Sequence, residues 1–433
     1  MASGIVKHGI ARTKQYRTAD QRQQDQVRIE KYRSLEDSIR ARVAAKDYAQ
    51  DTFDLSTKLL RANPEYYTIW NVRKRCLISG IFCGSSDGPS RSKASPSSTA
   101  APTGTPSCDD SSTSSSTRIP QDQPSQTTWK SGTIASDEGH DAKVDDEGTA
   151  AAEAAKRKVE DQQRHDLDVI KSELLFTVPL LMEFPKCYWI WNHRLWILNQ
   201  AIALLPVPLA RQVWEQELGL ASKMLNKDKR NFHAWGYRRR VVRQLEDPAL
   251  AGKSMVEPEF KYTRAMIEQD LSNFSAWHNR SKLIPRLLDE RGADVAARTK
   301  LLEEELALLQ NAINVGPEDQ SLWYYHQFLL LNIISKDPNT SFVSHLSPSQ
   351  RLQYIDEEME NIKDLLEDYV DIKWIYEALL ECTLAKTTIE DSVENIGSDR
   401  KEEVKAWLTK LKELDPMRQG RWQDVEKMYG LLE

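Results

Sequence analysis

Apolar and polar residues alternate along the chain with the spacing of helices that bury one face. Segments 213–220 and 301–309 each place apolar residues three or four positions apart, which predicts amphipathic helices. A polar turn follows each segment, and a second apolar stretch with a tryptophan follows the turn. This order predicts pairs of helices joined by short turns, an all-α fold with no strand of consequence.

A short phrase marks the second helix of each predicted pair. An aromatic residue stands three positions before a tryptophan, and an arginine stands three positions after it. Residues at these spacings share one face of a helix. We therefore expect the tryptophan to pack between neighbouring hairpins, and the arginine to lie beside an aromatic ring or to bind carbonyl groups. Five tryptophans occupy this place: Trp70, Trp191, Trp235, Trp277 and Trp323.

Two copies depart from the phrase. Around Trp323, Gln320 and His326 replace the aromatic residue and the arginine, and a weaker sixth copy lies near Trp374. From Trp191 to Trp323 the spacings are 44, 42 and 46 residues, a period typical of a solenoid of stacked helical pairs. We therefore predict a superhelical crescent of tandem helical hairpins.

The gap between the first two tryptophans is longer because it contains a polar insertion. Trp70 and Trp191 are 121 residues apart, and much of that gap is rich in Ser, Pro and Thr. Such a segment buries too little apolar surface to offset the entropy of ordering it. We predict an N-terminal segment with the first repeat (1–83), a disordered insertion (84–160), and the remaining α-α repeats with C-terminal helices (161–433).

Composition and charge narrow the classes of function. The formal net charge is −6, so the chain lacks the basic excess typical of nucleic-acid binding. The five cysteines form no CxxC pair and the eight histidines do not cluster, so we expect no metal site in this chain. No apolar run approaches the roughly 18 residues of a membrane span, and the charged N-terminus has no signal-peptide core. We expect a cytoplasmic protein with no transmembrane segment.

The five phrases, in this order and at this period, resemble the α subunits of protein prenyltransferases. The resemblance covers roughly residues 34–83 and 163–432, which is most of the chain outside the predicted insertion. Three details look like the Rab geranylgeranyltransferase (type II) branch in its compact fungal form. These are the His-Gly opening within 6–12, Phe232 in the third phrase, and the sequence Leu-Asp-Pro-Met-Arg at 414–418.

The resemblance implies a function and partners. An enzyme of this branch transfers geranylgeranyl from geranylgeranyl diphosphate to C-terminal cysteines of Rab GTPases, which an escort protein presents. The α subunit forms an obligate heterodimer with a β subunit. In the family the β subunit holds the zinc and most of the isoprenoid pocket, so the resemblance implies no metal bound by this chain.

The resemblance also assigns roles to four residues in the turns before two of the tryptophans. Lys186 matches a lysine near the diphosphate leaving group, so we expect it to be catalytic. Tyr188 matches a position on the protein-substrate side of the active site. Asn231 and His233 occupy the equivalent turn of the next repeat, and turns of successive hairpins stack at one rim. We expect these three residues to bind substrate.

Each of these residues also has a structural interpretation. Asn231 stands where a helix N-cap is expected. Tyr188 shares the aromatic position of the phrase, which favours core packing as an alternative. For His233 a structural role is as well supported as substrate binding. Without the resemblance, Lys186 would be interpreted as a solvent-exposed lysine in a turn.

Two further features bear on the choice of function. A local basic patch is formed by Arg238–Arg240 and Arg243. Two functions are open for it, contact with carboxylates of a partner and electrostatic steering of the diphosphate. The structural alternative is a solvent-exposed helix face. Trp189 stands where farnesyltransferase-like α subunits carry an amide, and an indole cannot reproduce the hydrogen bonds of that amide. The alternatives are the α subunit shared by farnesyltransferase and type I geranylgeranyltransferase, and a non-catalytic helical-repeat scaffold.

Overall fold

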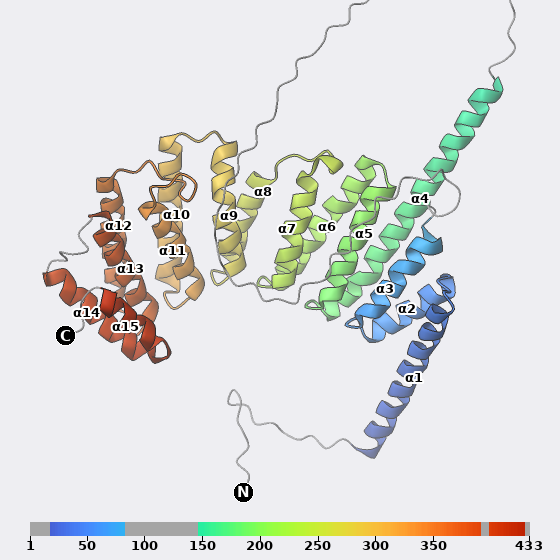
Figure 1. Ribbon diagram of the computed structural model, residues 1–433, viewed down its shortest axis with the longest axis horizontal. Coiled ribbons are helices and arrows are strands. Elements are labelled where there is room, and N and C mark those ends of the chain that lie inside the picture. The colour runs from blue at the N-terminus through green and yellow to red at the C-terminus, as the bar shows by residue number, and fades with distance from the viewer. Residues whose placement is uncertain (1–17, 83–145, 391–397, 429–433) are drawn as a thin grey trace, which may run out of the picture.

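The computed structural model describes residues 18–82, 146–390 and 398–428, and these residues form α-helices and no strand. After a leading helix, α1 (Ala19–Ala44), the helices pair into hairpins that stand side by side in a curved, elongated array (Figure 1). The predicted all-α repeat fold is therefore confirmed. The hairpins are α2 (Gln50–Ala62) with α3 (Tyr67–Cys76), α4 (Asp146–Glu183) with α5 (Tyr188–Leu204), α6 (Val207–Lys227) with α7 (Phe232–Glu246), α8 (Val256–Gln269) with α9 (Phe274–Glu290), α10 (Val295–Val315) with α11 (Gln320–Ile334), α12 (Pro348–Asp364) with α13 (Lys373–Ile389), and α14 (Ser398–Leu414) with α15 (Gln419–Met428).

The predicted boundary of the insertion is wrong at its C-terminal end. Helix α4 begins at Asp146, so residues 146–160 are helical rather than part of the insertion. This segment is rich in alanine, which has the highest intrinsic helix propensity, and the helix continues from there into the buried part of α4. The rest of the predicted insertion, 84–145, lies outside the described residues.

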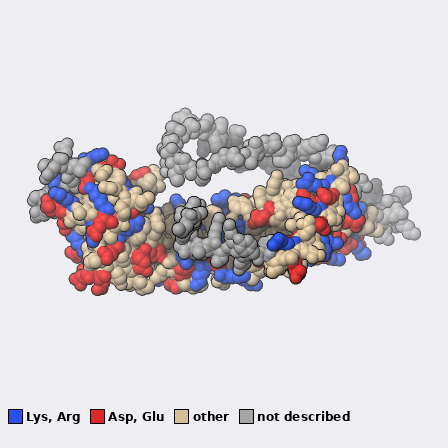
Figure 2. All heavy atoms as spheres, turned by 90° about the horizontal axis from the view of Figure 1, so that it is seen from below, with Lys and Arg blue, Asp and Glu red and all other residues tan. Residues whose placement is uncertain are grey.

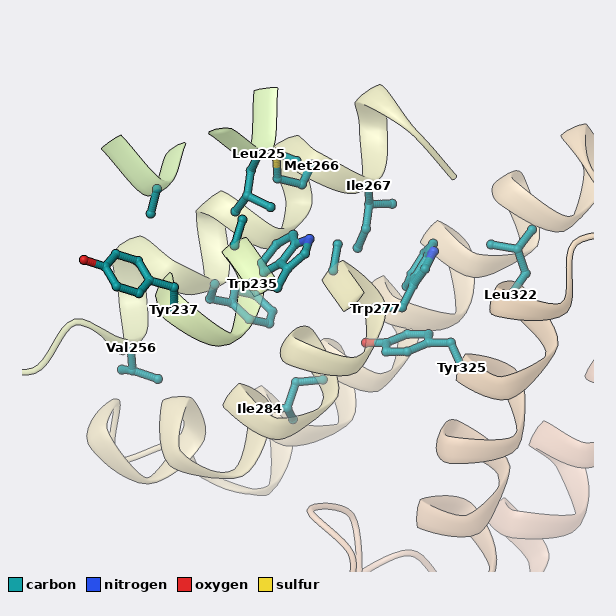
Figure 3. Close-up of a cluster of buried hydrophobic side chains, with 14 of the residues drawn as sticks. Leu225, Trp235, Tyr237, Val256, Met266, Ile267, Trp277, Ile284, Leu322 and Tyr325 are labelled. Atoms are coloured by element: carbon teal, nitrogen blue, oxygen red, sulfur yellow. The ribbon is translucent and has the colours of Figure 1, made fainter. Parts of the chain in front are cut away.

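The tryptophans of the phrase are buried between hairpins and fix the turns that precede their helices. Each indole Nε1–H donates to the carbonyl six residues earlier, at 2.6–3.0 Å, as Trp235 does to Lys229. Figure 3 shows Trp235 and Trp277 in the same buried cluster. The ring centroid of Trp277 lies 4.6 Å from that of Tyr325 in the next repeat. The indole therefore fills the space between hairpins, and its N–H satisfies a carbonyl of the turn that would otherwise need a backbone donor.

The sixth hairpin uses a different residue in the place of the tryptophan. In α13 the hydroxyl of Tyr376 donates to the carbonyl of Val370, six residues earlier, at 2.8 Å. Trp374 is only partly buried, and its ring lies 6.2 Å from that of Tyr324. The sixth phrase expected near Trp374 is therefore centred on Tyr376, two residues later.

The arginine of the phrase forms a buried ion pair that joins one hairpin to the next. Its guanidinium is bidentate to a glutamate on the first helix of the following hairpin, at 2.5–2.9 Å. It also donates to a hydroxyl on the first helix of its own hairpin, as Arg238 does to Ser222 at 2.7 Å. The pairs are Arg73–Glu173, Arg194–Glu217, Arg238–Glu259 and Arg280–Glu305. In the fifth hairpin His326 takes this place, 3.4 Å from Glu358.

Three of these arginines also lie over an aromatic ring, as the phrase predicts. The guanidinium carbon is 3.8 Å from the ring centroid of Phe53 for Arg73, 3.4 Å from that of Tyr262 for Arg238 and 3.7 Å from that of Phe260 for Arg280. The glutamate partners are the main feature that the sequence interpretation missed. The sequence does contain a sign of these pairs, because Glu217, Glu259 and Glu305 follow their arginines at similar spacings of 23, 21 and 25 residues.

Candidate functional site

The turns before α5 and α7 lie against each other, and one carbonyl joins them. The amide Nδ2 of Asn231 donates to the carbonyl of Pro185 at 3.3 Å, and Trp191 Nε1 donates to the same oxygen at 3.0 Å. The same link recurs along the array. Asn273 donates to the Lys229 carbonyl at 2.9 Å in the next repeat. Successive turns are therefore stacked at one rim, as the sequence predicted.

Asn231 has both ends of its side chain engaged in this stacking. Its Oδ1 accepts from the backbone N–H of Ala234 at 3.1 Å, which caps α7, while its Nδ2 binds Pro185. The residue is only 2% exposed. The structure therefore gives Asn231 a capping and linking function, and its predicted contact with substrate stays a prediction.

Two substitutions separate the cap from the link. Asn231→Ser keeps a neutral oxygen for the Ala234 N–H but loses the donor to Pro185, whereas Asn231→Ala loses both. Loss of an N-cap costs about 0.5–2 kcal/mol, and loss of a buried hydrogen bond costs a similar amount. We expect Asn231→Ala to lower the free energy of unfolding more than Asn231→Ser, as measured by urea denaturation. Equal stability of the two variants and the wild type would contradict the structural function.

Tyr188 and His233 meet at the entrance of a groove between α5 and α7. Their ring centroids are 5.3 Å apart with the rings edge to face, and Phe232 lies 5.8 Å from the imidazole. Tyr188 is 52% exposed, so its predicted alternative, core packing, is wrong. The same holds for the aromatic position in the other intact copies, where Tyr67, Phe232 and Phe274 are also exposed.

Lys186 lies exposed in the turn that precedes α5, next to the buried Cys187. Within the described part of the chain, no carboxylate lies within ion-pair distance of its ammonium. Trp189, two residues before Trp191 in α5, contacts Tyr67 of the preceding repeat with ring centroids 5.2 Å apart. The turn thus presents an uncompensated cation beside exposed aromatic rings, which suits an anionic ligand with an apolar part.

The groove between α5 and α7 has a volume of about 310 Å³ and two different ends. Trp191, Leu195 and Tyr237 line its apolar part, beyond Tyr188 and His233. Burial, reinforced by the Glu217 carboxylate, raises the pKa of Tyr237 well above its usual range, so its hydroxyl stays neutral. That hydroxyl donates to Glu217 at 2.6 Å, which ties the groove wall to the buried ion-pair system.

The basic patch predicted from the sequence is divided by the fold. Arg238 points into the array and pairs with Glu259, so it does not belong to the surface. Arg239, Arg240 and Arg243 are exposed and line the far end of the groove. Figure 2 shows that Lys, Arg, Asp and Glu are interspersed over both ends of the array, on the face turned to the viewer.

Within the described residues no group of three or more His, Cys, Asp or Glu side chains is placed to hold a metal ion. Over those same ranges, none of the helices combines the length and apolar character that crossing a membrane requires.

Five segments of the chain match the protein prenyltransferase alpha subunit repeat: residues 49–79, 170–201, 214–245, 256–287 and 302–333. The chain belongs to the protein prenyltransferase α subunits. The matched segments coincide with the first five hairpins, from α2–α3 to α10–α11, and each contains one phrase tryptophan. The α12–α13 hairpin of this prenyltransferase α subunit, centred on Tyr376, lies beyond the matched residues.

Two curated relatives of this prenyltransferase α subunit cover nearly its whole length. The geranylgeranyl transferase type-2 subunit alpha of Candida albicans is 28% identical, with 97% of each chain covered. The protein of the same name from Schizosaccharomyces pombe is also 28% identical, covering 97% of this chain and 98% of the relative. Among solved structures, a chain of Candida albicans protein geranylgeranyltransferase-I complexed with GGPP matches with a TM-score of 0.47 and 16% identity, covering 92% of this chain and 89% of that one.

Proposed function

We propose that this chain is the α subunit of a heterodimeric type II geranylgeranyltransferase. The observation that carries the proposal is the near full-length relation to fungal type-2 α subunits, with 97% of this chain covered in two of them. The enzyme transfers geranylgeranyl from geranylgeranyl diphosphate to C-terminal cysteines of Rab GTPases presented by an escort protein. We further propose that it acts in the cytoplasm.

The transfer needs two kinds of assistance. A cysteine thiol must react as thiolate at C1 of the allylic diphosphate, and the departing diphosphate must have its growing negative charge stabilised. The zinc that would favour the thiolate is proposed for the β subunit. From this chain we propose that Lys186 faces the leaving group, because an ammonium on a flexible stem is a compact point charge. Tyr188 and His233 would position the protein substrate.

A row of exposed aromatic residues supports the proposed heterodimer. The first four copies of the phrase expose 49–69% of the aromatic residue at the start of the second helix. The row continues into the fifth hairpin, where Tyr324 lies 6.1 Å from Phe274. Contiguous exposed apolar surface of this kind is typical of protein–protein contacts. We propose that the β subunit covers this row.

Co-expression with a cognate β subunit tests the proposal. We expect a stable heterodimer in gel filtration at micromolar concentration, and we expect Phe232→Glu to weaken it because the row would receive a charge. Val295→Glu is the matched control, since Val295 is also exposed but lies at the start of α10, a first helix. Separate migration of the two wild-type chains would contradict the heterodimer. Modification of an isolated C-terminal tetrapeptide without escort protein would instead favour the farnesyltransferase and type I alternative.

A further inference from the structure

The far end of the α5–α7 groove concentrates positive charge without a counter-ion. Among the described residues, no carboxylate lies within ion-pair distance of Arg239, Arg240 or Arg243. Arg239 makes one long hydrogen bond, in which its Nη1 donates to the amide oxygen of Asn279 at 3.4 Å. Like charges four residues apart on a helix, as at Arg239 and Arg243, destabilise it. This arrangement has an unfavourable electrostatic cost unless an anion binds there.

Repeat packing does not require these arginines. The equivalent groove between α9 and α11 has the same aromatic walls, formed by Phe274, Trp277 and Tyr325. The helix of that groove that corresponds to α7 is α11, and at the positions of Arg239 and Arg240, counted from the phrase tryptophan, it has Gln327 and Phe328. The α9–α11 groove is therefore built without an arginine cluster. Its lining has a single cation, Lys282 of α9, where the α5–α7 groove has three arginines.

The shape of the α5–α7 groove favours an extended ligand over a single small ion. His233 and Arg243 are ten residues apart on one helix, which corresponds to about 15 Å along the axis. An extended peptide covers that length with about five residues, at roughly 3.3 Å per residue. The apolar part of the groove, with Trp191 and Leu195, can accommodate an apolar side chain at the same time.

We propose that the α5–α7 groove takes an acidic peptide segment of the β subunit. The segment presents at least two carboxylates to Arg239, Arg240 and Arg243 and an apolar side chain to the groove wall. Guanidinium groups suit this ligand because they bind carboxylates with two parallel hydrogen bonds. The groove opens beside the exposed aromatic row, at Tyr188 and Phe232, so the segment is continuous with the proposed contact of the β subunit. The inference rests on the proposed heterodimer.

A triple variant tests the charge complementarity. Arg239→Gln, Arg240→Gln and Arg243→Gln together keep polar side chains and similar helix propensity but remove three charges. We expect the Kd for the β subunit at low salt to rise at least tenfold, and the dependence of Kd on salt concentration to become weaker. Lys282→Gln in the α9–α11 groove is the control, with an expected change below twofold. Circular dichroism at 222 nm checks that the triple variant is folded.

A cross-link identifies the occupant directly. In the heterodimer carrying Arg243→Lys, a carbodiimide joins the new ammonium to a carboxylate in contact with it, and mass spectrometry reads the linked peptide. An Asp or Glu of the β subunit in that peptide supports the proposal.

Three outcomes would overturn the proposal. Unchanged affinity and salt dependence of the triple variant overturn this inference alone, because the wild-type heterodimer still forms. Normal association combined with weakened binding of geranylgeranyl diphosphate shows that the groove holds a diphosphate instead of a peptide. Failure of the wild-type chain to bind the β subunit overturns both the inference and the proposed function.

Discussion

Arg194→Ala is expected to destabilise the array by about 3–5 kcal/mol, because it leaves Glu217 as a buried carboxylate without its counter-ion. Arg194 contacts both oxygens of that carboxylate at 2.7 Å, and it also donates to the Leu174 carbonyl at 2.6 Å. Domains are commonly stable by only about 5–15 kcal/mol, so one substitution removes a large share of the total. The measurement is urea denaturation followed by circular dichroism, with hydrogen exchange to locate the loss at the α5–α6 contact.

Two variants make this result specific. Replacing both Arg194 and Glu217 by methionine removes the charges together, so the double variant is expected to be more stable than Arg194→Ala. Arg264→Ala breaks an exposed pair with Glu268 and is expected to cost at most about 1 kcal/mol. An Arg194→Ala protein as stable as Arg264→Ala would show that the buried pairs do not hold the hairpins together.

Lys186→Ala is expected to lower kcat of the heterodimer by about 10²–10³, the usual effect of removing one group that stabilises transition-state charge. Binding of geranylgeranyl diphosphate is expected to change little, because the lysine is proposed to act on the charge that develops as the diphosphate departs. The measurement is single-turnover transfer to a Rab substrate with escort protein, alongside equilibrium binding of the isoprenoid diphosphate.

Arg230→Ala provides the matched control for the lysine. Arg230 stands at the same position of the next turn, is exposed, and lies 3.4 Å from Asp270. Its removal takes away a nearby positive charge without touching the proposed leaving-group contact. Equal kcat values for Lys186→Ala and the wild type would remove Lys186 from the mechanism.

The repeat architecture was predictable because its tryptophan is a large side chain at a fixed place in every hairpin. Each ring is buried against the next hairpin, and the hairpins have similar lengths. The tryptophans therefore recur in the sequence at a nearly constant spacing. Tyr376 was missed because a phenol reaches the same carbonyl as an indole, while the nearby Trp374 looked like the expected residue. The start of α4 was not predicted because its first residues lack helical apolar spacing. They lie in the polar segment, where the helix is favoured by the high intrinsic propensity of alanine.

The candidate site was predictable only in part. Stacking of successive turns brought Tyr188 and His233 together as expected, because both positions recur in each repeat. The burial of Asn231 and of Arg238 depended on contacts with a neighbouring hairpin. The glutamates follow three of the arginines by 21–25 residues, but the acceptor of Asn231 is a backbone carbonyl, which no residue type marks in the sequence. Adjacent arginines in the sequence do not indicate which of them is buried, and Arg238 points away from the groove end that Arg239 and Arg243 form.

The Arg73–Glu173 pair has a consequence for the order in which the chain acquires its structure during synthesis. The two residues are 100 positions apart, whereas Arg238 and Glu259 are 21 apart. At a ribosomal rate of about 5–20 residues per second, Arg73 waits roughly 5–20 s for its partner and Arg238 only about 1–4 s. The first hairpin therefore leaves the ribosome with an unneutralised guanidinium and an open flank. Of the four hairpins with an arginine–glutamate pair, it is the one expected to need chaperone protection for longest.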